Sequence, residues 1–138
     1  MPEAPGPEAA ARLIAAAGQA AAHAYAPYSK FQVGAALLFD DGSVVTGCNV
    51  ENVSYGLTSC AERNALFRAI SEAGPHRKVV AIAVTNTNGH PSPPCGACRQ
   101  VLSEFAAPDA MIYFPGNNGI ESRLLKELLP FQFRLDPR

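Results

Sequence analysis

The sequence carries no excess of charge of either sign. Among its 138 residues, 11 lysines and arginines face 12 aspartates and glutamates, which gives a net charge of −1 and an isoelectric point near 6.3. Binding to a phosphate backbone needs clustered positive charge, so this composition argues against a polynucleotide substrate and favours a small molecule. Hydrophobic residues make up 48% of the chain and charged residues only 17%. We therefore expect part of the apolar surface to be covered by other subunits.

The chain also has no apolar run long enough to cross a membrane, and its first residues have no basic character. The alanine-rich segment after Arg12 is interrupted by Gly18, Gln19 and His23, so we reject a membrane span and expect no membrane partner. The start lacks the positive charges of a secretory signal, and we expect a cytosolic protein. Cysteines are few, four in all, and without a signal they favour metal binding or catalysis over disulfides.

Length and patterning predict one domain, residues 1–138, with a loose proline-rich tail at 1–6. The expected elements are, in order, a helix at 8–23, strands at 31–39 and 44–50, a helix at 60–73, a strand at 78–85, a helix at 96–106, a strand at 111–114 and a helix at 122–129. Such alternation predicts an α/β fold, with helices on the faces of a mixed sheet. The continuous apolar run from Val79 to Val84 predicts a central strand covered on both faces.

Two short motifs carry the reactive side chains. They are Cys60-Ala61-Glu62-Arg63 and Pro94-Cys95-Gly96-Ala97-Cys98-Arg99. Three thiols suit zinc, and a site with three protein ligands leaves one coordination position open for water. Glu62 follows the first cysteine by two residues and can face that position without binding the metal. These groups suffice for metal-assisted hydrolysis, and the pattern resembles that of the zinc-dependent nucleoside and nucleobase deaminases.

Each motif is expected at the start of a helix that follows a strand and a loop. Both helix starts can then lie at the same end of the sheet, where the partial positive charge of a helix N-terminus stabilises thiolates. Three thiolates around a dication leave a net local charge of about −1, which would weaken the metal as a Lewis acid. Arg63 and Arg99 each follow a motif residue directly. We expect one or both to hydrogen-bond the sulfurs and offset that charge.

Other interpretations remain open for these residues. Ser59 and Glu62 also fit a capping box, in which Glu62 would be purely structural. The second cysteine pair could be a redox dithiol, although that leaves Cys60 and Glu62 without a role. A closed structural zinc site would need a fourth ligand, for which the candidates are Cys48, His23, His76 and His90. We interpret Cys48 as a small core residue and the histidines as surface or loop residues.

Over nearly its whole length, from Tyr25 to Phe133, the chain resembles the small homotetrameric cytidine deaminases. The segments that carry the resemblance are Phe31-Gln32-Val33-Gly34-Ala35-Ala36, Asn49-Val50-Glu51-Asn52, Cys60-Ala61-Glu62-Arg63 and Pro94-Cys95-Gly96-Ala97-Cys98-Arg99-Gln100. Each is moderately specific alone, and in this order and spacing they are very specific. The resemblance implies a three-layer α-β-α fold around a mixed sheet of about five strands. Four strands are clear, so the fifth should be short and lie near the C-terminus.

The resemblance also implies roles for single residues. The metal ligands would be Cys60, Cys95 and Cys98, with one zinc ion per subunit. Glu62 would be the catalytic proton shuttle, and Arg63 would neutralise thiolate charge. The substrate would be contacted by Phe31, Asn49, Glu51, Ala61, Tyr55 and Phe133. Among these, Asn49 and Glu51 would hydrogen-bond the ribose, chiefly its 3'-hydroxyl, and Phe31 would pack against the nucleoside.

Two of these contacts would cross a subunit boundary. Family members are homotetramers with shared sites, in which an aromatic residue at the position of Phe133 reaches a neighbour's site and the loop of Tyr55 does similar work. This chain has Phe131 as well as Phe133, so two aromatics compete for the first role. Without the resemblance, we would interpret Phe31 as a residue that packs in the hydrophobic core and Asn49 as a turn residue.

The implied reaction is the hydrolytic deamination of cytidine and 2'-deoxycytidine to uridine and 2'-deoxyuridine, with release of ammonia, a step of pyrimidine salvage. Glu62 would act as base and acid in turn. The alternatives are a related aminohydrolase such as a blasticidin S deaminase, a non-catalytic zinc-stabilised module, and a polynucleotide editor. The segment 49–52 favours a nucleoside substrate, and the lack of basic charge opposes the editor.

Overall fold

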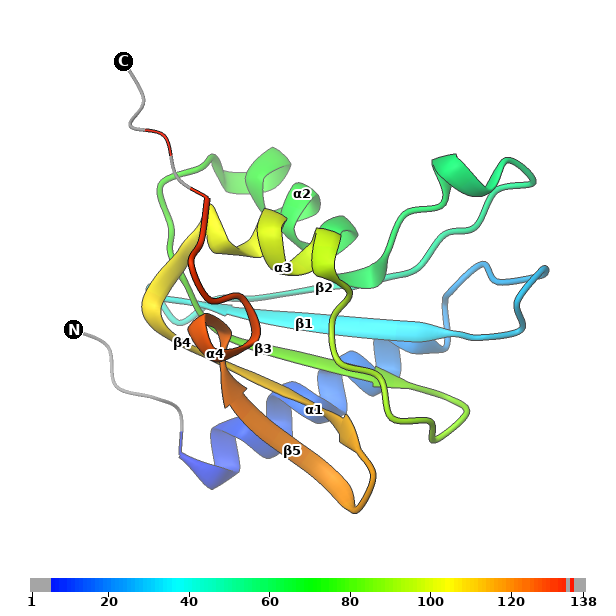
Figure 1. Ribbon diagram of the computed structural model, residues 1–138, viewed down its shortest axis with the longest axis horizontal. Helices are drawn as coiled ribbons and strands as arrows, with labels where there is room; N and C mark the ends of the chain where they lie inside the picture. Colours follow the sequence, from blue (N-terminus) through cyan, green and yellow to red (C-terminus); the bar gives the residue numbers. More distant parts are fainter. Residues whose placement is uncertain (1–5, 134, 136–138) are drawn as a thin grey trace.

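The computed structural model describes residues 6–133 and 135 and places them around one five-stranded sheet (Figure 1). The strands are β1 (Val33–Phe39), β2 (Val44–Cys48), β3 (Val79–Asn86), β4 (Ala106–Gly116) and β5 (Gly119–Leu124). The helices are α1 (Pro7–Ala21), the short 3-10 helix η1 (Tyr55–Leu57), α2 (Ala61–Ala73), α3 (Gly96–Ser103) and α4 (Leu125–Leu128). The order across the sheet is β2-β1-β3-β4-β5, with β3 and β4 parallel and the other neighbours antiparallel. The predicted α/β class with a mixed sheet is confirmed.

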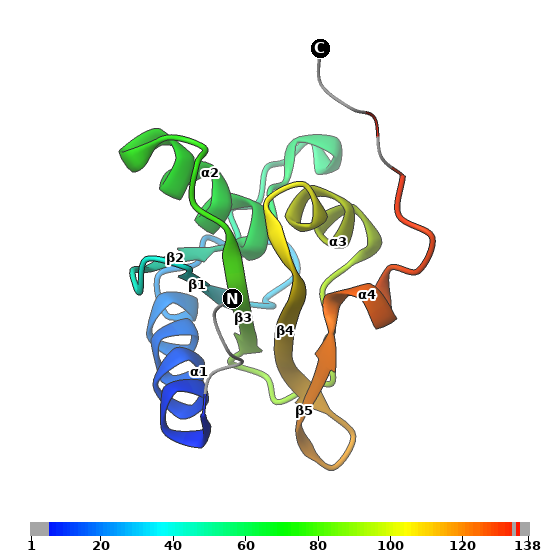
Figure 2. The ribbon, with the colours of Figure 1, turned by 90° about the vertical axis from the view of Figure 1, so that its left-hand side faces the viewer.

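Helices cover the sheet from both sides, as Figure 2 shows. Helix α1 packs on β1 and β3 from one side, whereas α2 packs on β1 and β2, and α3 lies against β4, from the other. Strand β3 lies at the centre, and its residues Val79 to Val84 are all buried because apolar clusters form on both of its faces. The three-layer α-β-α arrangement that the resemblance implied is therefore present.

The C-terminal third departs from the sequence prediction. The strand expected at 111–114 is the 11-residue β4, and residues 122–124, expected to begin a helix, belong to β5. Helix α3 ends early, at Ser103. Pro108 disfavours a strand locally, but the pairing of β4 with β3 shifts register before Met111, and tertiary pairing accommodates the proline there. The fifth strand expected near the C-terminus is confirmed as β5.

At the other end of the chain, helix α1 begins with Pro7 in its first turn, where the missing N–H costs nothing. Of the tail expected at 1–6, only Gly6 belongs to the described residues. The helix ends at Ala21, two residues before the expected boundary. Within the described chain, no helix is long and apolar enough to cross a membrane.

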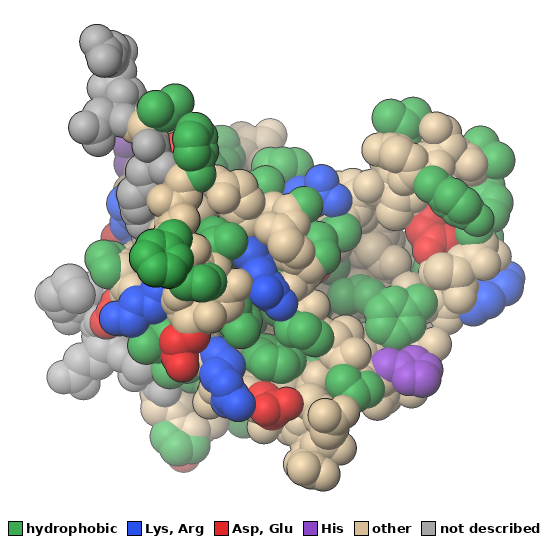
Figure 3. Space-filling model, viewed as in Figure 1, with side chains coloured by type: hydrophobic (Ala, Val, Ile, Leu, Met, Phe, Trp, Pro, Cys, Tyr) green, Lys and Arg blue, Asp and Glu red, His purple; other side chains and the backbone are tan. Residues whose placement is uncertain are grey.

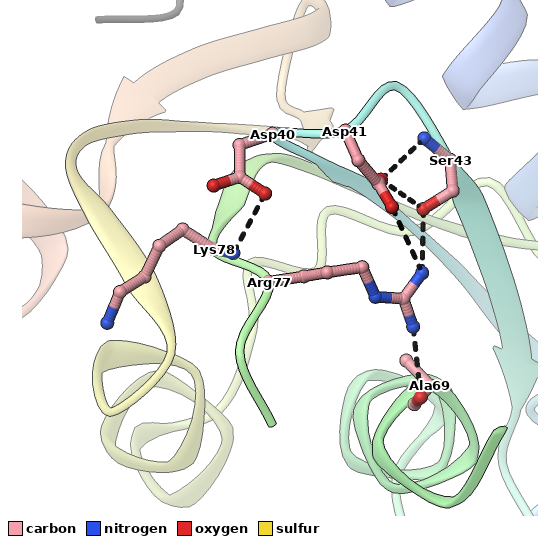
Figure 4. Close-up of polar contacts among 6 residues, drawn as sticks. All are labelled: Asp40, Asp41, Ser43, Ala69, Arg77 and Lys78. Carbon is pink, nitrogen blue, oxygen red and sulfur yellow. Dashed lines mark hydrogen bonds and ion pairs between the residues drawn. The ribbon is translucent and has the colours of Figure 1, made fainter. Parts of the chain in front are cut away.

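Arg77 ties α2 to the hairpin between β1 and β2, as Figure 4 shows. Its Nη1 donates to Ser43 Oγ at 2.7 Å, and its Nη2 donates to the carbonyl oxygen of Ala69 at 2.9 Å. The guanidinium also lies 4.3 Å from the centre of the Phe39 ring and forms an ion pair with Asp41 at 4.0 Å. The helix that begins with the first cysteine motif is thus fastened to the sheet near its far end.

Two glycines let helices lie directly against the sheet. A Cβ on Gly34 would overlap the carbonyl oxygen of Ala17 and lie 2.5 Å from the backbone nitrogen of Ala21, both in α1. A Cβ on Gly47 would lie 2.5 Å from the backbone nitrogen of Ala65 in α2. Any larger residue at either position must push a helix away, because the atoms that it would meet belong to the backbone.

Replacing Gly34 by alanine should lower the free energy of unfolding by about 1–3 kcal/mol, the usual cost of overpacking. The matched control is Gly18→Ala on the exposed side of α1, where the nearest atom to a new Cβ is 3.8 Å away. That change should raise the free energy of unfolding by about 0.5–1 kcal/mol, because alanine is the better helix former. Urea unfolding measures both values, and equal effects would contradict the close packing of α1.

Candidate active site

Three loops gather at one end of the sheet, at the right of Figure 1. They are residues 22–32 before β1, residues 49–60 after β2 and residues 87–95 after β3. The second and third loops lead directly into α2 and α3. The starts of both helices therefore lie at this end of the sheet, as the spacing of the two cysteine motifs predicted.

Three sulfur atoms meet where the two helices begin. The Sγ atoms of Cys60, Cys95 and Cys98 lie within 4.8 Å of one another, and those of Cys60 and Cys95 are 4.0 Å apart. Tetrahedral zinc with Zn–S distances of about 2.3 Å places its sulfurs about 3.8 Å apart, so both the ligand type and the spacing fit this metal. In the described part of the chain this is the one group of histidine, cysteine and acidic side chains with metal-binding geometry.

The candidates for a fourth protein ligand lie outside this group. His23, His76 and His90 are exposed, in line with their interpretation as surface or loop residues. Cys48 is half-buried at the end of β2, so its interpretation as a core residue is wrong. The reason is that β2 lies at the edge of the sheet, where one side of the strand stays open.

Hydrogen bonds make Cys60 an acidic thiol. A bond from the Cys98 thiol, with one from Arg63 Nη2 at 3.3 Å, lowers the pKa of Cys60 to about 5, although burial opposes ionisation. The same sharing of a proton with Cys60 raises the pKa of Cys98. Cys95 caps α3 and accepts a bond from the backbone N–H of Cys98 at 3.4 Å. Because metals bind thiolates, a cation that binds this cluster would displace the protons of these thiols.

Of the two arginines expected near the sulfurs, only Arg63 is seen to contact one. Arg99 instead donates from Nε to the carbonyl oxygen of Pro94 at 2.7 Å and from Nη1 to that of Leu128 at 3.0 Å. Arg99 thereby joins the loop before α3 to the end of α4. Its position one residue after Cys98 turns it toward these carbonyls, which leaves the compensation of sulfur charge to Arg63.

Glu62 lies in the first turn of α2, with only 4% of its surface exposed. Burial raises the pKa of its carboxyl. A capping box with Ser59 is not formed, because Cys60 is the residue that precedes the helix as its N-cap. The Ser59 hydroxyl donates to Asn64 Oδ1 at 2.6 Å instead. The Glu62 carboxyl therefore does not cap the helix together with Ser59, and it hydrogen-bonds the Cys98 thiol and its own backbone N–H instead.

A cavity of about 260 Å³ opens beside Glu62 and two of the thiols. All three loops contribute to its lining, which consists of Ser29, Phe31, Val33, Asn49, Glu51, Thr58, Cys60, Ala61, Glu62, Val84, Ser92, Pro93 and Cys95. Figure 3 shows the surface hollowed between the lobe of residues 49–60, at the upper right, and the helices. The structure thus brings four of the expected substrate contacts to one cavity: Phe31, Asn49, Glu51 and Ala61.

Asn49 fastens the backbone in front of β1 and is only 8% exposed. Its Oδ1 accepts a hydrogen bond from the N–H of Val33 at 2.8 Å, and its Nδ2 donates to the carbonyl oxygen of Phe31 at 2.9 Å. The Phe31 ring lies beside that of His90 in a tilted arrangement, with 6.1 Å between the ring centres. Phe31 is therefore a half-buried wall of the cavity and not a core residue.

Two expected substrate contacts do not reach the cavity of their own chain. Tyr55 is 80% exposed on η1, and Phe133 is 70% exposed after α4. Neither is among the residues that line the cavity. Phe131 is exposed as well, with an unusual φ of 53°. These aromatic side chains are available to another molecule.

Sequence reasoning missed several polar residues around the site. Ser29, Thr58 and Ser92 line the cavity. Asn64 donates to the carbonyl oxygen of Cys48 at 2.8 Å and so ties the first turn of α2 to β2. Ser29 lies within the span from Tyr25 to Phe133 over which the chain resembles the family, which was its only signal. The others lie in a polar loop or on a helix surface, where such residues are common.

The chain is similar to known proteins over most of its length. Residues 7–114 match the family model described as the cytidine and deoxycytidylate deaminase zinc-binding region. A cytidine deaminase from Halalkalibacterium halodurans is 56% identical over 122 residues, which cover 88% of this chain and 91% of that protein. A crystal structure of cytidine deaminase from Mycobacterium tuberculosis gives a TM-score of 0.80 at 48% identity, covering 91% of this chain and 97% of that one. A crystal structure of cytidine deaminase from Burkholderia pseudomallei gives a TM-score of 0.81 at 46% identity, covering 89% of this chain and 98% of that one.

Replacing Arg63 by alanine should make metal binding more sensitive to acid. Without the guanidinium the pKa of Cys60 rises, so protons displace the metal at a higher pH. We expect the pH at which half of the zinc is lost to rise by about one unit, equivalent to about 1.4 kcal/mol. Arg63→Lys keeps the charge and should shift the midpoint less, and Arg68→Ala, exposed on the same helix, should leave it unchanged. Metal analysis after dialysis at a series of pH values measures the midpoint, and an unchanged value for Arg63→Ala would contradict this role.

Proposed function

Because the chain belongs to the family of cytidine and deoxycytidylate deaminases, we propose that it hydrolyses cytidine and 2'-deoxycytidine to uridine and 2'-deoxyuridine and releases ammonia. The observation that carries the proposal is a buried carboxyl, Glu62, beside three clustered thiols at a cavity of about 260 Å³. This combination supplies a metal ligand set, a proton carrier and space for a small molecule. We assign the reaction to pyrimidine salvage and the protein to the cytosol, where thiols stay reduced.

Cys60, Cys95 and Cys98 would hold one zinc ion per subunit, which would supply a Lewis acid that activates water near neutral pH. The groups around the three sulfurs stabilise negative charge on them. Arg63 donates to Cys60 Sγ, and the N-termini of α2 and α3 add partial positive charge beside the sulfurs.

Glu62 is the group that moves protons in this mechanism. Its carboxylate takes a proton from the attacking water and delivers it to N3 of the pyrimidine, which makes C4 electrophilic. After the water oxygen has added to C4, the carboxyl carries the second proton to the amino group. Ammonia then leaves, and C4 keeps the oxygen as a carbonyl. A carboxyl whose pKa is raised by burial is suited to both accepting and donating the proton.

The rest of the cavity would hold the nucleoside. Phe31 and Ala61 would pack against it, and Asn49 and Glu51 would hydrogen-bond its ribose, chiefly the 3'-hydroxyl. All four residues line the cavity that also contains Glu62, which supports one shared binding site for base and sugar.

Glu62→Gln should lower kcat for cytidine about a thousandfold, the range expected for loss of a proton-transfer group, and should leave zinc content unchanged. Glu72→Gln is the matched control, because it makes the same change at an exposed position of the same helix. The decrease in absorbance of the cytosine ring measures the rate, with metal analysis on the same samples. A near-normal rate in Glu62→Gln would show that another group carries the proton.

The same assay separates the competing functions. If the zinc-loaded wild-type protein leaves both cytidine and 2'-deoxycytidine unchanged but deaminates blasticidin S, it is a related aminohydrolase. If it acts on none of these substrates, the zinc belongs to a non-catalytic module.

We also infer that four copies assemble into a homotetramer whose sites are shared. Exposed hydrophobic side chains support this assembly, since a monomer would leave them in water: Val53, Tyr55 and Leu57 on one loop and Phe131 and Phe133 near the C-terminus. Figure 3 shows hydrophobic side chains gathered over the first of these loops. A neighbour's aromatic side chain would close the cavity and exclude water.

If Phe133 serves the site of a neighbour, Phe133→Ala should lower kcat/KM for cytidine about tenfold, because a buried aromatic contact is lost. Co-expression of Phe133→Ala with Glu62→Gln should then restore part of the activity, because each variant supplies what the other lacks. Phe131→Ala is the matched control and should behave like wild type. Light scattering measures the oligomer, and a monomeric active enzyme would refute sharing. A larger loss with Phe131→Ala would assign the role to that residue.

A further inference from the structure

The turn before β1 points three hydrogen-bond donors at one carboxylate. Lys30 adopts a left-handed conformation, with φ of 60°, and its N–H donates to the carbonyl oxygen of Ala26 at 3.0 Å. The turn closed in this way presents the N–H groups of Tyr28 and Ser29 to Glu51 Oε1, at 3.0 and 3.2 Å. The hydroxyl of Ser29 donates to the other oxygen, Glu51 Oε2.

These contacts occupy most of the acceptor capacity of Glu51. A carboxylate offers about four acceptor positions, two on each oxygen. Oε1 receives two donors and Oε2 receives one, and the described residues provide no further hydrogen-bond donor, although the charge of Lys30 also acts on the carboxylate. The remaining position is therefore on Oε2, the oxygen that Ser29 holds, and Glu51 and Ser29 both line the cavity.

Ser29 also links this acid to the aromatic wall of the cavity. Its Oγ accepts a hydrogen bond from the N–H of Phe31 at 3.0 Å while it donates to Glu51. Asn49 holds the same segment from the other side, through the carbonyl oxygen of Phe31. One hydroxyl thus fixes the position of Glu51, which is proposed to contact the sugar, relative to Phe31, which is proposed to pack against the nucleoside.

We propose that Ser29 is a positioning residue that holds Glu51 Oε2 toward the sugar, so that recognition of the 3'-hydroxyl by Glu51 depends on the Ser29 hydroxyl. This inference deepens the proposed deaminase function and rests on its assignment of Glu51 to the ribose. Since Oε2 has one acceptor position left, a ligand without a donor there leaves that position unpaired, which lowers its affinity.

The protonation state of Glu51 agrees with such a role. The hydrogen bond from the Ser29 hydroxyl, with those from the two backbone N–H groups, holds the pKa of Glu51 below its ordinary value. The carboxyl therefore stays ionised at neutral pH and can only accept. Loss of the Ser29 hydroxyl leaves Oε1 tied to the backbone and releases Oε2.

The test compares Ser29→Ala and Ser29→Thr with wild type on cytidine and 3'-deoxycytidine. For cytidine, Ser29→Ala should raise KM about tenfold, the loss that about 1.4 kcal/mol corresponds to, with kcat changed less than about threefold. For 3'-deoxycytidine the same variant should match wild type within about twofold, because the hydroxyl that Oε2 would accept is absent. Ser29→Thr keeps a hydroxyl and should recover most of the affinity for cytidine. Ser71→Ala, at an exposed serine of α2, is the control for a distant change of the same kind.

The outcomes distinguish a role of Ser29 in positioning Glu51 from a merely structural role of this residue. Equal losses on both substrates, or loss of kcat alone, would overturn the proposal, because a merely structural role would not distinguish the two sugars. Thermal unfolding of each variant identifies a folding defect, in which case Ser29→Thr alone carries the comparison. If the wild-type protein does not deaminate cytidine, calorimetric binding of uridine and 3'-deoxyuridine replaces KM. Selective weakening of uridine binding by Ser29→Ala would then support the role of Ser29 although the proposed reaction had failed, and no binding of either nucleoside would overturn both.

Discussion

Negative charge concentrated on three sulfurs is the constraint on which the rest of this structure depends. The sulfurs lie within 4.8 Å of one another, a distance at which thiolates repel strongly in a protein interior. Two helix N-termini, the Arg63 guanidinium on Cys60 and a backbone N–H on Cys95 all direct positive charge at this point. A cation held by the three sulfurs would complete the balance. Glu62 can then stay buried beside the cluster, where we propose that its carboxyl carries protons and is not a ligand.

This requirement explains how the helices are fixed. Helix α2 is held near its start by Asn64, which donates to the carbonyl oxygen of Cys48, and near its end by Arg77, which donates to that of Ala69. Gly47 lets its backbone touch β2 directly. Helix α3 is held through Arg99, which joins the loop before it to the end of α4. A ligand set drawn from two helices keeps its spacing only if both helices are rigid, and these contacts supply that rigidity.

Recognition of the sugar is proposed to follow a different principle. The chain is nearly neutral, and its cavity is lined by few charged groups, so attraction over long distances contributes little. Asn49 and Glu51 instead use most of their hydrogen bonds to hold the loop of residues 28–33. These two side chains keep few free hydrogen-bonding positions, and the direction of each position is fixed by the bonds already made. Selectivity can then arise from the penalty of leaving one acceptor unpaired.

Local spacing along the chain was enough to predict the cluster of three thiols, the neighbouring Glu62 and the central strand, because cysteine pairs within one turn of a helix and continuous apolar runs depend on neighbours in sequence. The α/β class and the fifth strand followed from the order of the elements and the family resemblance. Other features depend on residues far apart in the chain. The length of β4 through Pro108, the half-buried state of Cys48 on an edge strand, the contact of Arg99 with Leu128 and the contact of Ser29 with Glu51 all arise from pairing and packing between separate segments of the chain. Local preferences do not encode such contacts, since each is decided by which surfaces the folded sheet brings together.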